Sequence, residues 1–95
     1  MSDFVLARVA PLVGETFDLP DAPGVTWTLT EVNGFGTVAD PATHQSFSLI
    51  FRGAPAPVFA QQTVTLRHPT LGEQAIFITP VAAYAEGVSY EAVFN

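Results

Sequence analysis

A chain of 95 residues that is 48% hydrophobic and only 13% charged has the composition of one folded domain, because disordered chains combine low hydrophobicity with high net charge. We therefore expect a single domain over residues 1–95. Cysteine is absent, which excludes disulfides and thiolate metal sites. Three arginines against nine carboxylates give a formal net charge of −6, a balance that argues against nucleic acid and anionic membranes as partners.

The beginning of the chain carries its helical signals. Ser2 is a suitable N-cap for a short helix over Asp3–Ala10, and Pro11 is expected to end that helix. We expect its one or two turns to cover the end of a sheet. Met1-Ser2-Asp3 lacks the basic region of a signal peptide, and no apolar stretch is long enough to span a membrane. The chain is therefore expected to be cytoplasmic as synthesised, with no membrane span.

Two strands are predicted in the next part of the chain. Glu15–Leu19 alternates apolar and polar residues, and Val25–Glu31 does so more clearly, with Trp27 on its apolar face and three threonines on the other. Asn33-Gly34 is a dipeptide typical of a two-residue hairpin turn. Gly34–His44 is then the longest irregular segment that we expect.

Four more strands are predicted in the remainder of the chain: Gln45–Arg52, Thr63–Arg67, Glu73–Thr79 and Val88–Phe94. The third is apolar on both faces, which indicates a central strand or a strand covered on both sides, and Pro80 is expected to end it. Six strands separated by short turns favour an all-β fold, either a small antiparallel β-sandwich or a barrel, with a short N-terminal helix.

The apolar phase of each strand predicts one shared interior. Val58 and Phe59 are expected to fold back onto it from the proline-rich connector that begins at Gly53. Aromatic side chains fill a domain of this size, so we expect little room for a deep ligand pocket. The predicted core consists of Trp27, Phe47, Leu49, Phe51, Val64, Leu66, Phe77, Tyr90 and Phe94.

Several segments of the chain resemble a known family. Phe47–Gly53 (FSLIFRG), Leu66–Glu73 (LRHPTLGE) and Tyr90–Asn95 (YEAVFN) are similar to segments of short uncharacterised bacterial proteins, and Pro11–Phe17 is similar to the family's opening. These proteins are domains of unknown function. Their genes often lie beside phage-tail-collar-like fibre proteins, so the resemblance implies an accessory subunit of a tail-like or fibrous surface assembly, displayed outside the cell. It identifies no catalytic residue.

Candidate reaction chemistry is sparse. His44 and His68 would need a carboxylate such as Asp40 or Glu73 to bind a metal, and no metal-ligand spacing links them. We expect His68 to bond a turn carbonyl instead. No serine lies in a nucleophile motif, and no phosphate-binding loop is present. We therefore predict no catalytic, cofactor-binding or metal-binding residue, and do not expect an enzyme.

Interaction is the chemistry that the sequence favours. Arg52 and Arg67 are expected to form surface or interface ion pairs, and Tyr84 is expected to be exposed in a loop. The last strand carries Glu91 and an outward Val93, and either pairs inside the barrel or offers its edge to a protein partner or a second copy. We expect binding to use strand edges and loops, above all this terminal edge.

These expectations lead to two functional predictions. The first is a non-enzymatic structural or interaction module, an accessory subunit of the kind of assembly that the resemblance implies. The alternative is a small ligand-binding domain that recognises carbohydrate through loop aromatics.

Overall fold

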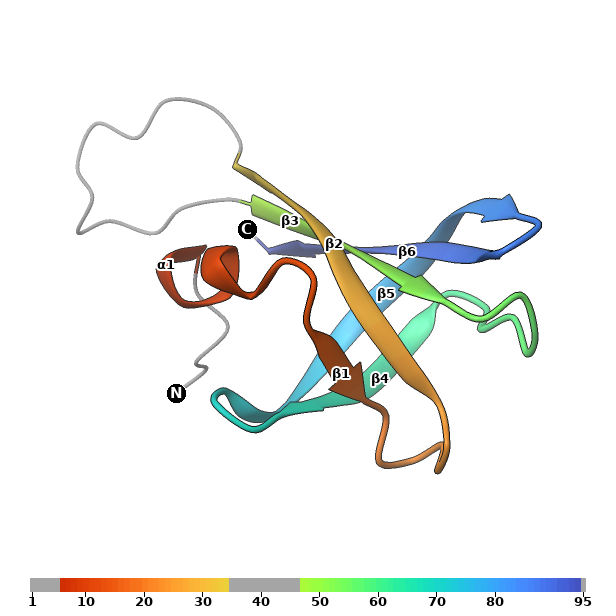
Figure 1. Ribbon diagram of the computed structural model, residues 1–95, viewed down its shortest axis with the longest axis horizontal. Coiled ribbons are helices and arrows are strands. Elements are labelled where there is room, and N and C mark those ends of the chain that lie inside the picture. Colours follow the sequence, from red (N-terminus) through yellow and green to blue (C-terminus); the bar gives the residue numbers. More distant parts are fainter. Residues whose placement is uncertain (1–5, 35–46, 95) are drawn as a thin grey trace.

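The computed structural model describes residues 6–34 and 47–94. It is a closed barrel of antiparallel strands in the order β1-β2-β3-β6-β5-β4 (Figure 1). The predicted all-β fold is confirmed, and of its two forms the barrel is the one adopted. β1–β2–β3 and β4–β5–β6 each form a three-stranded meander, and the meanders join where β3 meets β6 and β1 meets β4. The strands span Thr16–Asp18 (β1), Thr26–Gly34 (β2), Phe47–Gly53 (β3), Gln62–His68 (β4), Gly72–Tyr84 (β5) and Gly87–Phe94 (β6).

A short helical segment covers one end of the barrel, opposite the β5–β6 hairpin (Figure 1). α1 spans Leu6–Val9 and continues directly into a 3-10 turn, η1, at Ala10–Leu12. Pro11 does not end the helical segment as predicted. It lies in the first turn of η1, where the N–H that proline lacks has no helical acceptor. Val9 and Leu12 are buried in the core, so the predicted cover over the sheet is confirmed. Residues 2–5 of the predicted helix lie outside the described residues.

β2 is longer than the predicted strand. Its ladder with β3 runs through Asn33-Gly34, which pairs with Ser48 and Phe47. The predicted hairpin turn at this dipeptide is therefore wrong, because both residues continue the strand. The rest of the predicted irregular segment, which extends to His44, lies outside the described residues.

β5 is the longest strand, and the prediction that Pro80 ends it is wrong. It continues through Pro80, because the register with β6 shifts directly after the proline and the bulge accommodates a residue that lacks an N–H. Of the two possibilities for its apolar faces, the central position is correct, because β5 pairs with β4 and with β6, whereas cover on both faces is wrong. Ile76 and Ile78 are buried, whereas Phe77 between them is 53% exposed and lies outside the core.

The core is organised around stacked aromatic rings. Trp27 and Tyr90 stack with ring centroids 4.2 Å apart, and Phe59 meets Trp27 edge-on at 5.6 Å. The backbone N–H of Phe59 donates to the Tyr90 hydroxyl at 2.9 Å, which ties the connector to the core. The predicted return of Phe59 is therefore confirmed, but that of Val58 is wrong, because this side chain is 60% exposed. Apart from Phe77, the predicted core residues are buried, and Phe94 packs partly buried against them.

β6 is a central strand of the barrel. It pairs with β3 through seven residues, from Phe94 to Val88, and with β5 on its other side. Its backbone donors and acceptors are thus used within the sheet. Of the two possibilities for the terminal strand, pairing inside the barrel is correct, and the expectation that Val88–Phe94 offers an open edge to a partner is wrong.

Candidate functional site

Four of the five residues predicted for interaction lie on three adjoining strands. Arg52 belongs to β3, Glu91 and Val93 to β6, and Tyr84 to the end of β5. Val93 and Tyr84 are each 49% exposed. The exposure predicted for Tyr84 is confirmed, but its predicted place in a loop is wrong. Arg67 lies apart from this group, on β4 where that strand meets β1.

Arg52 is held against the β5–β6 hairpin. Its Nε donates to the Ser89 hydroxyl at 3.2 Å, and its guanidinium carbon lies 4.6 Å from the centre of the Tyr84 ring. Gly87 makes room for this arrangement, because a side chain there would collide with Arg52 and with the Gly53 carbonyl oxygen. In the part of the chain that the structure describes, Arg52 therefore makes a cation–π contact where an ion pair was expected.

Arg67 forms the surface ion pairs that the sequence predicts. Its guanidinium lies 3.5 Å from an Asp18 carboxylate oxygen and 3.9 Å from one of Glu73. All three side chains are about half exposed, at 50%, 51% and 56%. Exposed pairs of this kind stabilise a fold by only about 0–1 kcal/mol, so the cluster positions charge beside the β1–β4 junction more than it strengthens the junction.

His68 is a buried link between β4 and the segment before β1. It is 3% exposed, its Nε2 lies 2.8 Å from a Glu15 carboxylate oxygen, and its Nδ1 accepts a hydrogen bond from the Thr70 N–H at 3.0 Å. The turn carbonyl predicted as its partner is wrong, since the partner is a turn amide. Because Nδ1 accepts, Nε2 carries the proton and donates to Glu15. Both ring nitrogens are thus engaged, and His44 lies outside the described residues.

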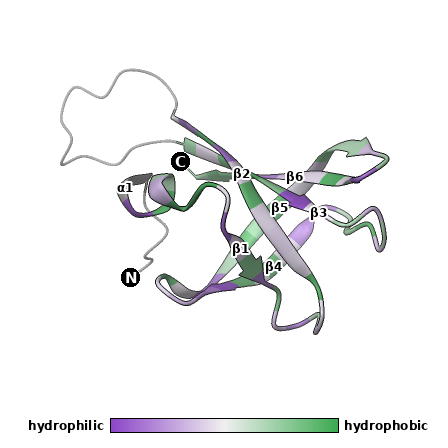
Figure 2. Cartoon of the chain, in the orientation of Figure 1, coloured by the Kyte–Doolittle hydropathy of each residue, from purple (hydrophilic) through white to green (hydrophobic). Residues whose placement is uncertain are grey.

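An exposed apolar patch on the outer face of β5 was missed by the sequence analysis. We define the β5 outer patch as the exposed residues Ala75 and Phe77, which pair with Thr65 and Thr63 of β4. Figure 2 colours parts of β5 as hydrophobic. One of its apolar residues, Phe77, is nevertheless exposed. The sequence signal is ambiguous, because the residues at 76 and 78 on one face and those at 75 and 77 on the other are all apolar, and the structure places the first pair inward.

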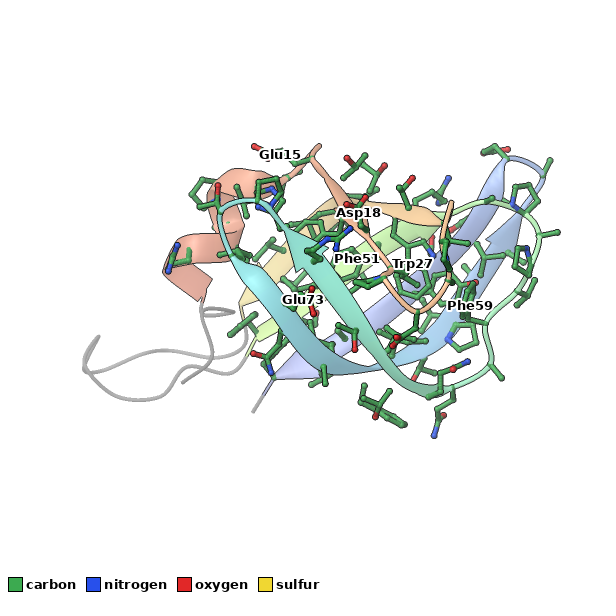
Figure 3. The ribbon with its side chains drawn as sticks, turned by 90° about the horizontal axis from the view of Figure 1, so that it is seen from below. Glu15, Asp18, Trp27, Phe51, Phe59 and Glu73 are labelled. Atoms are coloured by element: carbon green, nitrogen blue, oxygen red, sulfur yellow. The ribbon has the colours of Figure 1, made fainter. Side chains whose placement is uncertain are left out.

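The junction between β1 and β4 is open beyond Asp18, where β1 ends. A hollow of about 160 Å³ lies there, between the turn that follows β1, the connector and β4. Figure 3 views this region from below, with Asp18 and Glu73 to one side and Phe59 to the other. The hollow depends on two segments far apart in sequence, residues 19–22 and residues 59–65, so no local pattern could predict it. Its walls are formed by Leu19, Asp21, Ala22, Phe59, Gln62, Thr63, Val64 and Thr65.

Groups that would carry a reaction do not gather in the described part of the chain. Within residues 6–34 and 47–94, no three His, Cys, Asp or Glu side chains lie together as a metal site requires. Ser48 and Ser89 lie within strands, and Ser89 binds Arg52. No helix among the same residues is long and apolar enough to cross a membrane.

Comparison with known proteins assigns the chain to a family. The family model described as Domain of unknown function (DUF6916) matches residues 4–94. The match spans nearly the whole chain, so the chain belongs to this family, and the expected membership in a family of unknown function is confirmed. No curated protein and no solved structure matches the chain.

Proposed function

We propose that this member of the DUF6916 family is a non-enzymatic protein-interaction module, an accessory subunit of a tail-like or fibrous surface assembly. The observation that most supports interaction is the β5 outer patch, where Phe77 is 53% exposed. Burying such a side chain against a partner is favourable by about 1.5–3 kcal/mol. A ring fixed on a paired strand is therefore a suitable anchor. The kind of assembly is what the family resemblance implies.

The charges near the patch favour a basic partner over a second copy. Glu73 lies two residues before Ala75 and is 56% exposed, and Glu91 pairs with Thr79, two residues after Phe77. With a net charge of −6 per chain, two copies repel each other. A partner surface with an apolar centre and a basic rim complements both features.

Carbohydrate binding has less support in the geometry. Sugar rings stack on exposed aromatic faces, but Trp27 is only 1% exposed. Tyr84 is exposed, yet Arg52 lies over one face of its ring. The carbohydrate alternative therefore serves as the competing outcome of the experiment.

The experiment compares the wild type with Phe77→Ser and with Val13→Ser, a matched control because Val13 is 48% exposed away from the patch. Partners are captured from the source cells, identified, and titrated as pure proteins against each variant. We expect at least about tenfold weaker binding for Phe77→Ser, which is about 1.4 kcal/mol, and unchanged binding for the control. Equal binding by both variants would contradict the patch as the interaction surface.

Light scattering at several concentrations and a glycan array on the same protein test the alternatives. Growth in particle mass with concentration, lost in Phe77→Ser, would make a second copy the partner. A strictly monomeric protein with saturable glycan binding would reverse the ranking in favour of carbohydrate.

A further inference from the structure

One backbone edge of β4 has a strand beside it at a single position only. β4 pairs with β5 along its whole length but with β1 only where Arg67 meets Asp18. Successive residues of a strand direct their N–H and C=O groups alternately to its two sides, so about two of the residues in Gln62–Thr65 direct theirs to the open side. An unpaired row of donors and acceptors is a template for another strand.

The turn that follows β1 does not use this edge. The backbone hydrogen bonds of this turn are made within the turn. Leu19 N–H donates to the Val25 carbonyl oxygen at 3.2 Å, Ala22 N–H donates to that of Leu19 at 2.9 Å, and Val25 N–H donates to that of Ala22 at 3.0 Å. Outside the strand ladders, no described backbone hydrogen bond joins this turn to β4. Among the described residues, the turn therefore leaves the backbone groups on this edge of β4 without a backbone partner.

The sequence of this edge contains none of the usual protection. Gln62-Thr63-Val64-Thr65 has neither a charged residue nor a proline, and native proteins commonly place lysine or proline on exposed edges to prevent pairing. Three of the four residues are β-branched, which favours extended backbone. The composition of Gln62–Thr65 therefore favours backbone pairing with another strand.

The hollow beside the edge suits one apolar side chain. Leu19, Ala22, Phe59 and Val64 contribute its apolar walls, and its volume is about 160 Å³. A cavity of about 150 Å³ accepts a molecule the size of benzene, so the hollow can accept a leucine or phenylalanine side chain. The wall is preformed, because the Tyr90 hydroxyl fixes the Phe59 backbone at 2.9 Å.

We propose that the Gln62–Thr65 edge binds an extended peptide segment of a partner protein as an added strand. One apolar side chain of the peptide enters the hollow, and a neighbouring lysine or arginine lies beside Asp21 at its rim. The added strand takes the place that β1 leaves after Asp18. This proposal rests on the proposed interaction function and names the chemistry of the partner.

A single peptide strand is favoured over the edge of a second copy. The hollow is bordered on one side by the turn and on another by Phe59, and a single strand is the narrowest partner that can reach β4 between them. A whole barrel would also bring a second net charge of −6 to the rim that carries Asp21. A short basic peptide meets neither obstacle.

The test is a selection from a displayed library of random nine-residue peptides. Wild-type protein is the target, and Ala22→Leu, which fills the hollow, is used to remove peptides that bind elsewhere. We expect the enriched peptides to share a central leucine, isoleucine or phenylalanine flanked by lysine or arginine. An enriched set without a shared apolar position, or no enrichment over the starting library, would overturn the proposal.

Synthetic copies of the enriched peptides then test strand addition itself. A copy with alternate backbone amides N-methylated keeps the side chains but cannot form a ladder, and should bind at least tenfold more weakly. Binding should shift the backbone NMR signals of Gln62–Thr65 and fall at least tenfold in Ala22→Leu, with Ala85→Leu in the exposed β5–β6 turn as the matched control. Equal binding by the methylated copy would overturn the proposal.

Failure of this inference can be told from failure of the proposed function. Phe77→Ser should leave peptide binding unchanged, and Ala22→Leu should leave any contact through the β5 outer patch unchanged. If no peptide depends on the β4 edge while a pure partner still depends on Phe77, the edge site is wrong and the interaction function stands. If neither dependence is found, both are wrong.

Discussion

The barrel closes along two seams that are built in different ways. At the first, β3 and β6 pair through seven residues, from Phe47 opposite Phe94 to Gly53 opposite Val88. At the second, β1 and β4 pair at a single position. At this second seam a side-chain hydrogen bond adds to the short backbone pairing: His68 Nε2 lies 2.8 Å from a Glu15 carboxylate oxygen.

The difference shows how a small sheet can close with unequal strands. The first seam needs no charged group, because backbone hydrogen bonds and stacked rings such as Phe47 on Phe94, with centroids 4.7 Å apart, hold both strands. The second seam is held by a few polar side chains and leaves part of β4 unpaired. We call the β3–β6 junction the sealed seam and the β1–β4 junction the open seam, and it is at the open seam that we propose peptide binding.

The largest expected effect comes from Phe51→Ala. Phe51 lies on β3 at the sealed seam, is fully buried, and meets Phe17 of β1 edge-on at 5.3 Å, so it supports both seams. The free energy of unfolding should fall by about 3–5 kcal/mol. Denaturant titration measures this, with Phe77→Ala as the same change on an exposed ring. A loss below about 1 kcal/mol would mean that Phe51 is not a core residue.

Gly87→Ala tests how tightly the sealed seam is closed at its end. An added Cβ would collide with the Gly53 carbonyl oxygen and with the stem of Arg52. Because the first of these is backbone, the strands must shift, and we expect a loss of about 1–3 kcal/mol. Thermal unfolding together with faster hydrogen exchange at Val88 would support this, whereas unchanged stability would show that the hairpin is loose.

His68→Leu tests whether side chains hold the open seam. The substitution keeps an apolar body but leaves the Thr70 N–H and the Glu15 carboxylate without their partner, and should cost about 1–2 kcal/mol. Hydrogen exchange should quicken at Asp18 and Arg67 and stay unchanged along β3 and β6. Equal quickening at both seams would refute the distinction between them.

The smallest effect is expected at the Arg67 ion pairs. Arg67→Met keeps most of the side-chain stem and should change the free energy of unfolding by less than about 1 kcal/mol. A double-mutant cycle with Asp18→Asn should give a coupling of the same small size that declines as salt is added. A coupling above about 2 kcal/mol that is insensitive to salt would make this pair a principal support of the open seam.

Much of the fold follows from the sequence alone. Periods of two place Trp27, Leu49 and Phe51 in a common interior, because adjacent residues of a strand must face opposite sides. Turn residues separate most of the strands. For the candidate site, the sequence predicts the ion pairs of Arg67 and the exposure of Tyr84.

Other features were decided by contacts between distant segments. Phe77 is apolar in a strand that is apolar on both faces, so only its neighbours reveal that it lies outside. Pro80 ends a strand by local rules, but a bulge lets β5 continue past it. Which strand has a free edge is set by pairing: β6 ends the chain yet lies between two strands, whereas β4 in the middle of the chain is left open because β1 stops at Asp18. The sequence by itself determined which residues are buried along most strands, because alternation is local. The tertiary structure alone decided where the barrel is open, because strand pairing joins residues that the chain keeps far apart.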